Sequence, residues 1–287
     1  THPTKPGLKI PQMFEAAIDK ELKGLWIIGE DIVQTDPNSA HVVEAMNSLE
    51  LLVVQEIFMS ETAKLATVVL PGTTFLEKDG TFTNTERRIQ RVNRAVPPLP
   101  GTKPDGVIVT DMMQKLGFDQ PTYDADKMLK EIADVVPFFK GVTRERLGKL
   151  GLQWPVQEDG TDTQILHTET FKLGKGRLKN FDWKESSEIE ANQKEYPLIL
   201  TTSRVLQHYN AATMTRRTKN INIVDEDVLL IHPKDAAVRD INTGDIGRLY
   251  SGRGEVALKV EVTDKVKEGI VFTTFHFPEH MVNMVTG

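Results

Sequence analysis

The chain has 287 residues, 39% of them hydrophobic and 26% charged, which is ordinary for a globular protein of about two domains. It contains no cysteine, which excludes disulfides, an iron–sulfur cluster held by this segment and a cysteine nucleophile. A net charge of -6 without a dense basic stripe argues against nucleic-acid binding. Two small basic groups, within residues 87–94 and at 216–217, fit either a small anionic ligand or ordinary solvated faces.

We expect no targeting segment and no membrane span in these residues. Residues 1–12 carry four prolines or glycines and no apolar block, unlike a signal peptide. The longest apolar stretches, such as 49–58, are interrupted by charged and polar residues. They fall short of the roughly 20 apolar residues that a bilayer span needs. A cytoplasmic location is therefore expected.

The first predicted module covers residues 1–118. Apolar spacing and helix-start signals predict, in order, a helix at 12–22, a strand at 25–28, a helix from Asp36-Pro37, a strand at 51–54, a helix at 60–65 and a strand at 67–70. Apolar strands that alternate with helices indicate a parallel sheet covered on both faces. Residues 71–101 are predicted to be mostly irregular, and a last helix fits 105–116.

Residues 119–195 are predicted to connect this module to a second one. One helix fits 124–136, and the polar, glycine-rich composition of 151–195 predicts an extended linker with a few hairpin-like pieces. The second module covers 196–287. Its predicted strands lie at 197–201, 228–231, 246–250, 255–262 and 270–275, with short helices at 213–219 and 234–239. Several short strands at such spacing indicate a small β-barrel.

Polar side chains follow the ends of the predicted parallel strands. Asp31 and Glu56 are carboxylates at neighbouring strand tips, and Gln55 offers both a donor and an acceptor. Ligands bind outside the carboxyl ends of such strands, where these groups suit a ribose or a guanine edge. A structural interpretation is equally open, in which Asp31 and Asp36 cap helices and Glu56 is a solvated loop residue. No GxGxxG motif is present, so the standard dinucleotide fingerprint is absent.

A second polar run, residues 201–210, follows the first strand of the second module. Arg204, His208 and Asn210 lie in it beside several hydroxyl side chains. Such a density of donors favours a site that clamps a phosphate or a heterocycle. For His208 taken alone, a capping or surface role is the simpler interpretation.

His276 and His280 are spaced four residues apart and invite comparison with a zinc site. Pro278 lies between them and would break the helix that aligns them, and no third ligand is evident. We therefore predict no metal ligand in the chain. No Ser/His/Asp arrangement can be identified from the sequence.

Characteristic blocks of sequence occur in order along nearly the whole chain. They are GEDIVQTDPN at 29–38, VQEIFMSETA at 54–63, EKDGTFTNTERR at 77–88, LQWP at 152–155, TSR, HYN and MTRR within 202–217, and INTGD and GR within 241–248. Together these blocks resemble the C-terminal portion of the large subunit of molybdopterin-dependent formate dehydrogenases.

The resemblance implies an α/β fold, with a parallel-sheet Rossmann-like domain followed by a C-terminal double-psi-type β-barrel. It also implies a bis(molybdopterin guanine dinucleotide) cofactor with molybdenum or tungsten, at which formate is oxidised to carbon dioxide. The residues that match the family's cofactor-binding positions are Asp31, Thr35, Gln55, Glu56, Gly72, Asp105, Arg204, His208 and Asn210. The family position at Gly72 is often a serine, so backbone would replace a side-chain contact there.

The family's catalytic residues, its cysteine or selenocysteine metal ligand and its iron–sulfur cluster belong to an N-terminal part that these blocks do not include. The resemblance therefore predicts no catalytic residue here, and partners that are the rest of the same subunit and electron-transfer subunits. Relatives continue through a further segment, so the barrel is expected to be incomplete. Two alternatives stay open: another member of the superfamily, such as a nitrate reductase or the NADH dehydrogenase large subunit, which can lack the cofactor, and a stand-alone nucleotide-binding module.

Overall fold

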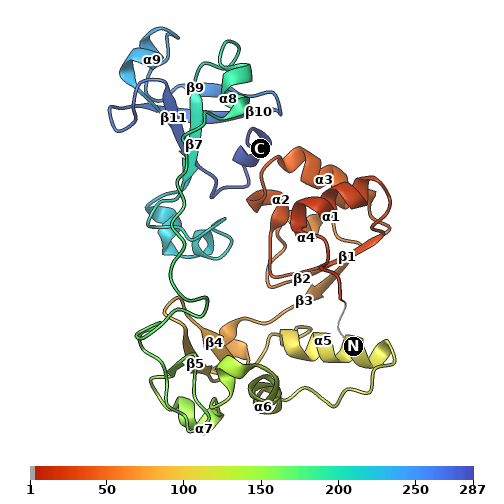
Figure 1. The fold of residues 1–287 in the computed structure, drawn as a ribbon. Helices are drawn as coiled ribbons and strands as arrows, with labels where there is room; N and C mark the ends of the chain where they lie inside the picture. The colour runs from red at the N-terminus through yellow and green to blue at the C-terminus, as the bar shows by residue number, and fades with distance from the viewer. Residues whose placement is uncertain (1–3) are drawn as a thin grey trace. The chain divides into compact units, whose positions relative to one another are not determined.

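The computed structural model describes residues 4–287, which form two compact units (Figure 1). Unit 1 joins the residues up to Val69 with Trp183–Gly287, and unit 2 is Leu70–Asp182. These units reflect packing within the chain. The domain boundaries predicted at residues 118 and 195 concern sequence modules and stay predictions. Within the described residues, no helix combines the length and the apolar character that a membrane crossing requires.

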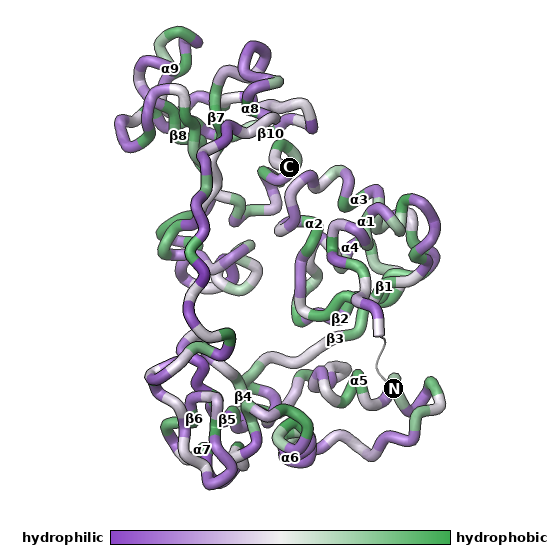
Figure 2. Tube along the Cα trace, viewed as in Figure 1, coloured by the Kyte–Doolittle hydropathy of each residue, from purple (hydrophilic) through white to green (hydrophobic). Residues whose placement is uncertain are grey.

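Unit 1 begins with a three-stranded sheet in the order β1-β2-β3. Strands β1 and β2 are parallel, and Ile28 at the end of β1 lies opposite Gln55. The strands are β1 (Gly24–Ile28), β2 (Leu51–Glu56) and β3 (Val68–Pro71), and the helices are α1 (Ile10–Ile18), α2 (Ile32–Thr35), α3 (Ser39–Ser48) and α4 (Glu61–Lys64). The strands predicted from apolar runs are thus confirmed, and hydrophobic residues concentrate along them in Figure 2.

The helices of this part pack on one face of the parallel sheet. Phe14 of α1 and Val42 and Met46 of α3 form a buried core with Leu52 and Val54 of β2. On the strands, the residues with the opposite orientation are partly open: Ile28, Leu51 and Val68 are 49%, 45% and 42% exposed. These three residues lie at strand ends, whereas Trp26 and Val53 between them are partly buried. The prediction that both faces of the sheet are covered therefore stays a prediction.

The helix predicted from Asp36-Pro37 begins later. Helix α3 starts at Ser39, and its N-cap is Asn38, whose φ is 55° and whose side chain makes no capping bond. Asp36 instead ends α2, a helix that the predicted loop did not include. The backbone N–H of Asn38 donates to the carbonyl oxygen of Thr286 at 3.1 Å. This long-range bond fixes the entry to α3, and a local pattern cannot reveal it.

The second part of unit 1 is a five-stranded mixed sheet in the order β7-β11-β8-β10-β9. Strand β8 is parallel to β10 and antiparallel to β11, and the core contains Ile231, Leu258, Val260 and Val271. Its elements are α8 (Ser187–Asn192), β7 (Ile199–Ser203), η3 (Thr215–Arg217), η4 (Lys219–Asn222), β8 (Val228–Ile231), α9 (Pro233–Ala237), β9 (Ile246–Tyr250), β10 (Glu255–Val262), β11 (Ile270–Thr274) and η5 (Val282–Met284). The helix predicted at 213–219 is two 3-10 turns. Across residues 4–287, β7 and β9 remain the two edges of this sheet, so closure into a barrel is not observed.

Unit 2 is built on a small antiparallel sheet in the order β4-β5-β6. Its elements are η1 (Phe75–Glu77), β4 (Gly80–Thr83), β5 (Arg88–Val92), α5 (Asp105–Lys115), α6 (Ala125–Val135), η2 (Pro137–Phe139), α7 (Arg144–Leu147) and β6 (Leu152–Gln153). Residues 71–101 are mostly irregular, as predicted, but they include a β4–β5 hairpin that the sequence analysis does not predict. Part of the predicted linker is also ordered, because Leu152 pairs with Ile89 of β5.

Candidate functional site

The carboxyl ends of β1 and β2 bring four predicted site residues to one edge of the parallel sheet. The N–H of Gly29, just after β1, donates to the carbonyl oxygen of Gln55 at 2.9 Å. Asp31 and Thr35 lie in the segment after β1, while Gln55 and Glu56 end β2. The parallel register therefore gathers these side chains as the strand order predicts.

Asp31 has a structural role at this edge. Its buried carboxylate accepts hydrogen bonds from the N–H of Glu61 at 3.2 Å, and from the N–H and hydroxyl of Thr62 at 2.8 and 2.7 Å. It thereby caps the first turn of α4 instead of its own helix. The hydroxyl of Thr62 also accepts from the N–H of Val33 at 3.1 Å. These bonds tie the segment after β1 to the segment after β2.

The other three residues differ in accessibility and bonding. Gln55 is 1% exposed, and the Oε1 of Glu56 accepts a hydrogen bond from the N–H of Ile57 at 2.7 Å. The hydroxyl of Thr35 donates to the carboxylate of Asp36 at 3.3 Å, and burial raises the pKa of Asp36 above its ordinary value. An amide and a carboxylate at one strand end can bind the hydrogen-bonding edge of a planar base.

Arg204 and Asn210 form a second polar group in the loop after β7. The guanidinium of Arg204 lies 4.8 Å from the centroid of the Phe275 ring and donates to Oδ1 of Asn210 at 3.3 Å. Asn210 and Ala212 have φ of 49° and 54°, a left-handed conformation that non-glycine residues seldom adopt. Such backbone persists where its surroundings hold it, and it is frequent at ligand sites.

His208 is buried, and both ring nitrogens are used within the protein. Nε2 lies 2.8 Å from the carbonyl oxygen of Val224, so it carries the proton, and Nδ1 lies 3.0 Å from the hydroxyl of Thr215. That hydroxyl also accepts from the N–H of Tyr209 at 3.2 Å. A histidine bonded on both sides holds its loop in shape and leaves neither nitrogen for a ligand.

Gln34, which is not among the predicted site residues, links the two groups of them in unit 1. Its buried side-chain amide lies 3.1, 3.2 and 3.0 Å from the carbonyl oxygens of Ala211, Phe275 and His276. The backbone carbonyl oxygen of Gln34 accepts a hydrogen bond from the side-chain amide of Asn283 at 2.7 Å. Gln34 thereby joins the segment that holds Asp31 and Thr35 to the loop that holds Arg204 and Asn210. Only its position within the 29–38 block could have singled it out.

His276 and Asp227 extend this network. His276 donates from Nδ1 to the carbonyl oxygen of Asn210 at 2.6 Å and accepts at Nε2 from the N–H of Val205 at 3.1 Å. The buried carboxylate of Asp227 accepts from the N–H groups of His276 and Phe277 at 3.1 and 3.0 Å. Burial lowers the pKa of His276, which keeps the ring neutral. Its role is to hold the loop at 205–210.

The histidine pair gives no metal site. Nδ1 of His280 lies 3.3 Å from the carbonyl oxygen of Ala257, while His276 is bound to the loop described above. Across the part of the chain that the structure describes, no three His, Asp or Glu side chains gather as metal ligands.

Unit 2 contains the remaining predicted residues, Gly72 and Asp105. Gly72 forms a parallel bridge with Lys103, and the carboxylate of Asp105 is paired with the ammonium group of Lys78. Lys78 also donates to the carbonyl oxygen of Thr73 at 3.3 Å. The hydroxyl of Thr73 is buried and has no hydrogen-bond partner among the described residues. A buried hydroxyl without a partner in the protein is a candidate for contact with a ligand or an ordered water.

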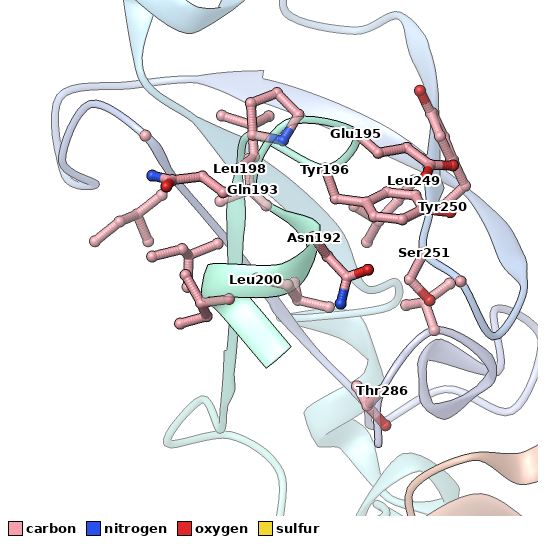
Figure 3. A pocket seen from close by; sticks show the side chains of 18 of the residues that line it. Asn192, Gln193, Glu195, Tyr196, Leu198, Leu200, Leu249, Tyr250, Ser251 and Thr286 are labelled. Carbon is pink, nitrogen blue, oxygen red and sulfur yellow. The ribbon is translucent and has the colours of Figure 1, made fainter. Parts of the chain in front are cut away.

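A further cavity in unit 1 is lined by none of the nine predicted residues. It has a volume of about 1480 Å³ and is lined by α8, β7, β9 and residues 285–287. Figure 3 shows Tyr196 and Tyr250 on one side of it and Leu198 and Leu200 on another. The rings of Tyr196 and Tyr250 meet edge to face at 5.9 Å. The cavity touches both edge strands of the mixed sheet and is not the site that the sequence predicts.

Family models match both ends of the chain. Residues 1–115 match the model described as molybdopterin oxidoreductase, and residues 198–287 match the molydopterin dinucleotide binding domain. The F420-dependent formate dehydrogenase subunit alpha of Methanocaldococcus jannaschii is 42% identical over 284 residues, which is 98% of this chain and 42% of that protein. A putative formate dehydrogenase of Staphylococcus aureus is 40% identical over 92% of this chain and 27% of its own length. The chain thus spans less than half of the length of these relatives.

A solved structure agrees on the fold. Acetylene hydratase from Pelobacter acetylenicus superimposes with a TM-score of 0.69 over 96% of this chain and 42% of that one, at 19% identity. At this identity the likeness concerns the fold alone. It supports the mixed α/β architecture and carries nothing about the reaction.

Proposed function

The chain belongs to the molybdopterin oxidoreductase family, as a C-terminal portion, and from this premise we propose that it binds part of a bis(molybdopterin guanine dinucleotide) cofactor in a formate dehydrogenase. When bound, the cofactor supplies the molybdenum or tungsten centre at which formate is oxidised to carbon dioxide. The observation that carries the proposal is the bonding of Gln34 to the loop at 204–211. It joins two groups of polar residues, each suited to one part of a dinucleotide.

The chemistry of these residues fits such a cofactor. Gln55 and Glu56 offer an amide and a carboxylate to a guanine edge, and Thr35 lies at the same strand ends. Arg204 and Asn210 present a planar cation and an amide on a loop that His276 holds. A fixed guanidinium suits a phosphate or the edge of a pterin. In unit 2, the hydroxyl of Thr73 is buried without a partner among the described residues, beside Gly72.

We assign each group of residues a distinct task. Gln55 and Glu56 orient the base, Arg204 and Asn210 bind the pterin end, and Gln34 keeps the two groups in register. No proton or electron transfer is assigned to this chain. The remainder of the subunit would supply the metal ligand and the reacting groups, and electron-transfer subunits would accept the electrons.

The mixed sheet also belongs to the proposal, as part of a double-psi-type barrel. Its two edges, β7 and β9, both line the cavity of about 1480 Å³. Both edges are unpaired within the described residues and line one cavity, which fits a barrel in which further strands would pair. Hydrogen exchange in the full-length protein tests this. Protected outer amides of β7 and β9 would support closure, and rapid exchange there would refute it.

A pair of charge-neutralising substitutions tests the guanine assignment. Glu56→Gln removes the carboxylate at the carboxyl end of β2. Glu50→Gln is the control, because Glu50 precedes the amino end of the same strand and pairs with Lys23 at 2.9 Å in an exposed position. In the full-length protein, Glu56→Gln should weaken guanine nucleotide binding about tenfold, the scale of one lost charge-assisted hydrogen bond. Equal binding by both variants would exclude Glu56 from the site.

Formate turnover tests the reaction itself. The full-length protein, purified without oxygen, is assayed for formate-dependent reduction of an artificial electron acceptor. Reduction that requires formate and stops when the metal is removed would support the proposed activity. A metal-loaded protein that reduces no acceptor with formate would leave the family assignment in place and refute the substrate.

A further inference from the structure

Arg217 and Phe58 form a cation–π pair that the cofactor contacts proposed above do not use. The guanidinium carbon of Arg217 lies 4.1 Å from the centroid of the Phe58 ring. One guanidinium nitrogen donates a hydrogen bond to the carbonyl oxygen of Thr213. Phe58 follows β2, whereas Arg217 ends η3. Because the ring supports one face and the carbonyl fixes one edge, the guanidinium plane has a defined orientation.

Arg217 differs in this respect from its neighbour Arg216. Arg216 forms an ion pair with Glu279 at 3.3 Å, whereas within residues 4–287 no such pair involves Arg217. Partial burial lowers the pKa of Arg217, whereas the negative charges of Glu56 and Asp31 raise it. An arginine keeps its charge under these conditions. Arg217 is also an exposed residue, so the face turned away from Phe58 remains open to a planar group.

The pair lies beside the place where ligands bind in parallel sheets. Phe58 comes two residues after Glu56, the last residue of β2, and ligands of such folds sit outside the carboxyl ends of the strands. A carboxylate at this position accepts hydrogen bonds from the ring N–H and the exocyclic amine of guanine, an edge that adenine does not offer. A stacking surface next to such a carboxylate completes a base site.

We propose that Arg217, held flat by Phe58, is the platform on which the purine ring of a guanine nucleotide stacks. This inference rests on the proposed function and adds a residue that grips the base. Bases stack on aromatic rings and on guanidinium planes, and such contacts are a main source of binding energy in nucleotide sites. The role of Arg217 is therefore to contact the base through its plane, and not the phosphate through its charge.

The test separates the contribution of the planar guanidinium of Arg217 from the contribution of its positive charge. GMP and ribose 5-phosphate are titrated into the cofactor-free full-length protein, and melting temperature is recorded for each variant. Arg217→Lys keeps the charge and loses the plane, and Phe58→Leu removes the support. Arg216→Lys is the matched control. Arg217→Lys and Phe58→Leu should weaken the binding of GMP roughly fivefold or more, which is the scale of the loss of one stacked base. Binding of ribose 5-phosphate should change less than about twofold, because it has no base.

Each outcome decides a different claim. GMP binding that weakens in Arg217→Lys at an unchanged melting temperature supports the platform. Equal weakening of GMP and ribose 5-phosphate shows a phosphate contact and overturns it. Unchanged GMP binding in Arg217→Lys overturns the platform and leaves the guanosine site standing. A wild-type protein that does not bind GMP overturns the guanosine site and the platform together.

Discussion

The side-chain amide of Gln34 lies 3.0 Å from the carbonyl oxygen of His276. Gln34 belongs to the segment after β1, and His276 follows β11. The same amide reaches the carbonyl oxygens of Ala211 and Phe275, and His276 in turn holds Asn210 through its ring. One residue therefore connects the strand-end group of polar side chains with the loop at 204–211.

We predict that Gln34→Met lowers the free energy of unfolding by roughly 1–3 kcal/mol, because buried carbonyl oxygens lose their donor. Chemical denaturation measures this change. The control is Gln114→Met, since the side chain of Gln114 makes one exposed hydrogen bond, to Gln120. Its effect should stay within about 0.5 kcal/mol. An equally small effect of Gln34→Met would mean that the amide does not join the two segments.

Asp31 provides a second prediction, because its carboxylate accepts three hydrogen bonds from Glu61 and Thr62. Asp31→Ala should destabilise the protein by about 0.5–2 kcal/mol, the range for the loss of a helix N-cap. Glu30→Ala, at the exposed neighbouring position, should have little effect on thermal unfolding. If both variants have the same melting temperature as the wild type, the capping role of Asp31 is wrong.

His276 makes stability depend on pH. Burial lowers its pKa below the ordinary value of 6.5, and the groups that face it are Asp227, His208 and Arg204. The unfolded chain therefore binds a proton more readily than the folded protein, so the contribution of His276 is complete above pH 6.5 and is lost as pH falls below it. Chemical denaturation at several pH values between about 7.5 and 5 should show this decline in the free energy of unfolding. In His276→Gln the decline should be smaller, and an identical pH profile would contradict the assignment.

Close packing in unit 2 yields a prediction about a glycine. A Cβ on Gly141 would lie 1.6 Å from the carbonyl oxygen of Gln157, whereas a Cβ on Gly80 would meet nothing within 4 Å. Gly141→Ala should destabilise the protein by about 1–3 kcal/mol, because the clash involves backbone. Gly80→Ala should leave the melting temperature nearly unchanged. Equal melting temperatures for the two variants would show that the backbone at Gln157 can shift to accommodate a Cβ at position 141 without loss of stability.

The elements that the sequence predicts well are apolar runs bounded by glycine or charged residues. The strand predicted at 51–54 lies within β2, and those predicted at 228–231 and 255–262 coincide with β8 and β10. The β4–β5 hairpin escaped prediction because Arg88, Gln90 and Arg91 make up most of β5, and its pairing with β4 is a tertiary feature.

In the candidate site, too, local sequence predicts some features, whereas others depend on tertiary contacts. The parallel register places Gln55 and Glu56 at one edge, as strand order alone predicts. The roles of Gln34 and His276 could not be predicted, because their partners are backbone carbonyl and N–H groups distant in sequence. The spacing of His276 and His280 resembles that of a zinc pair, yet the two ring nitrogens of His276 are bonded to the backbone of Asn210 and Val205.

The most direct test of cofactor binding is the metal and nucleotide content of the native full-length protein, purified without oxygen. Molybdenum, tungsten and acid-released guanine nucleotide are measured on one sample. We predict one of the two metals, with about two guanine nucleotides for each metal atom, as a bis(guanine dinucleotide) cofactor requires. A well-folded full-length protein that contains neither metal nor guanine nucleotide would contradict it.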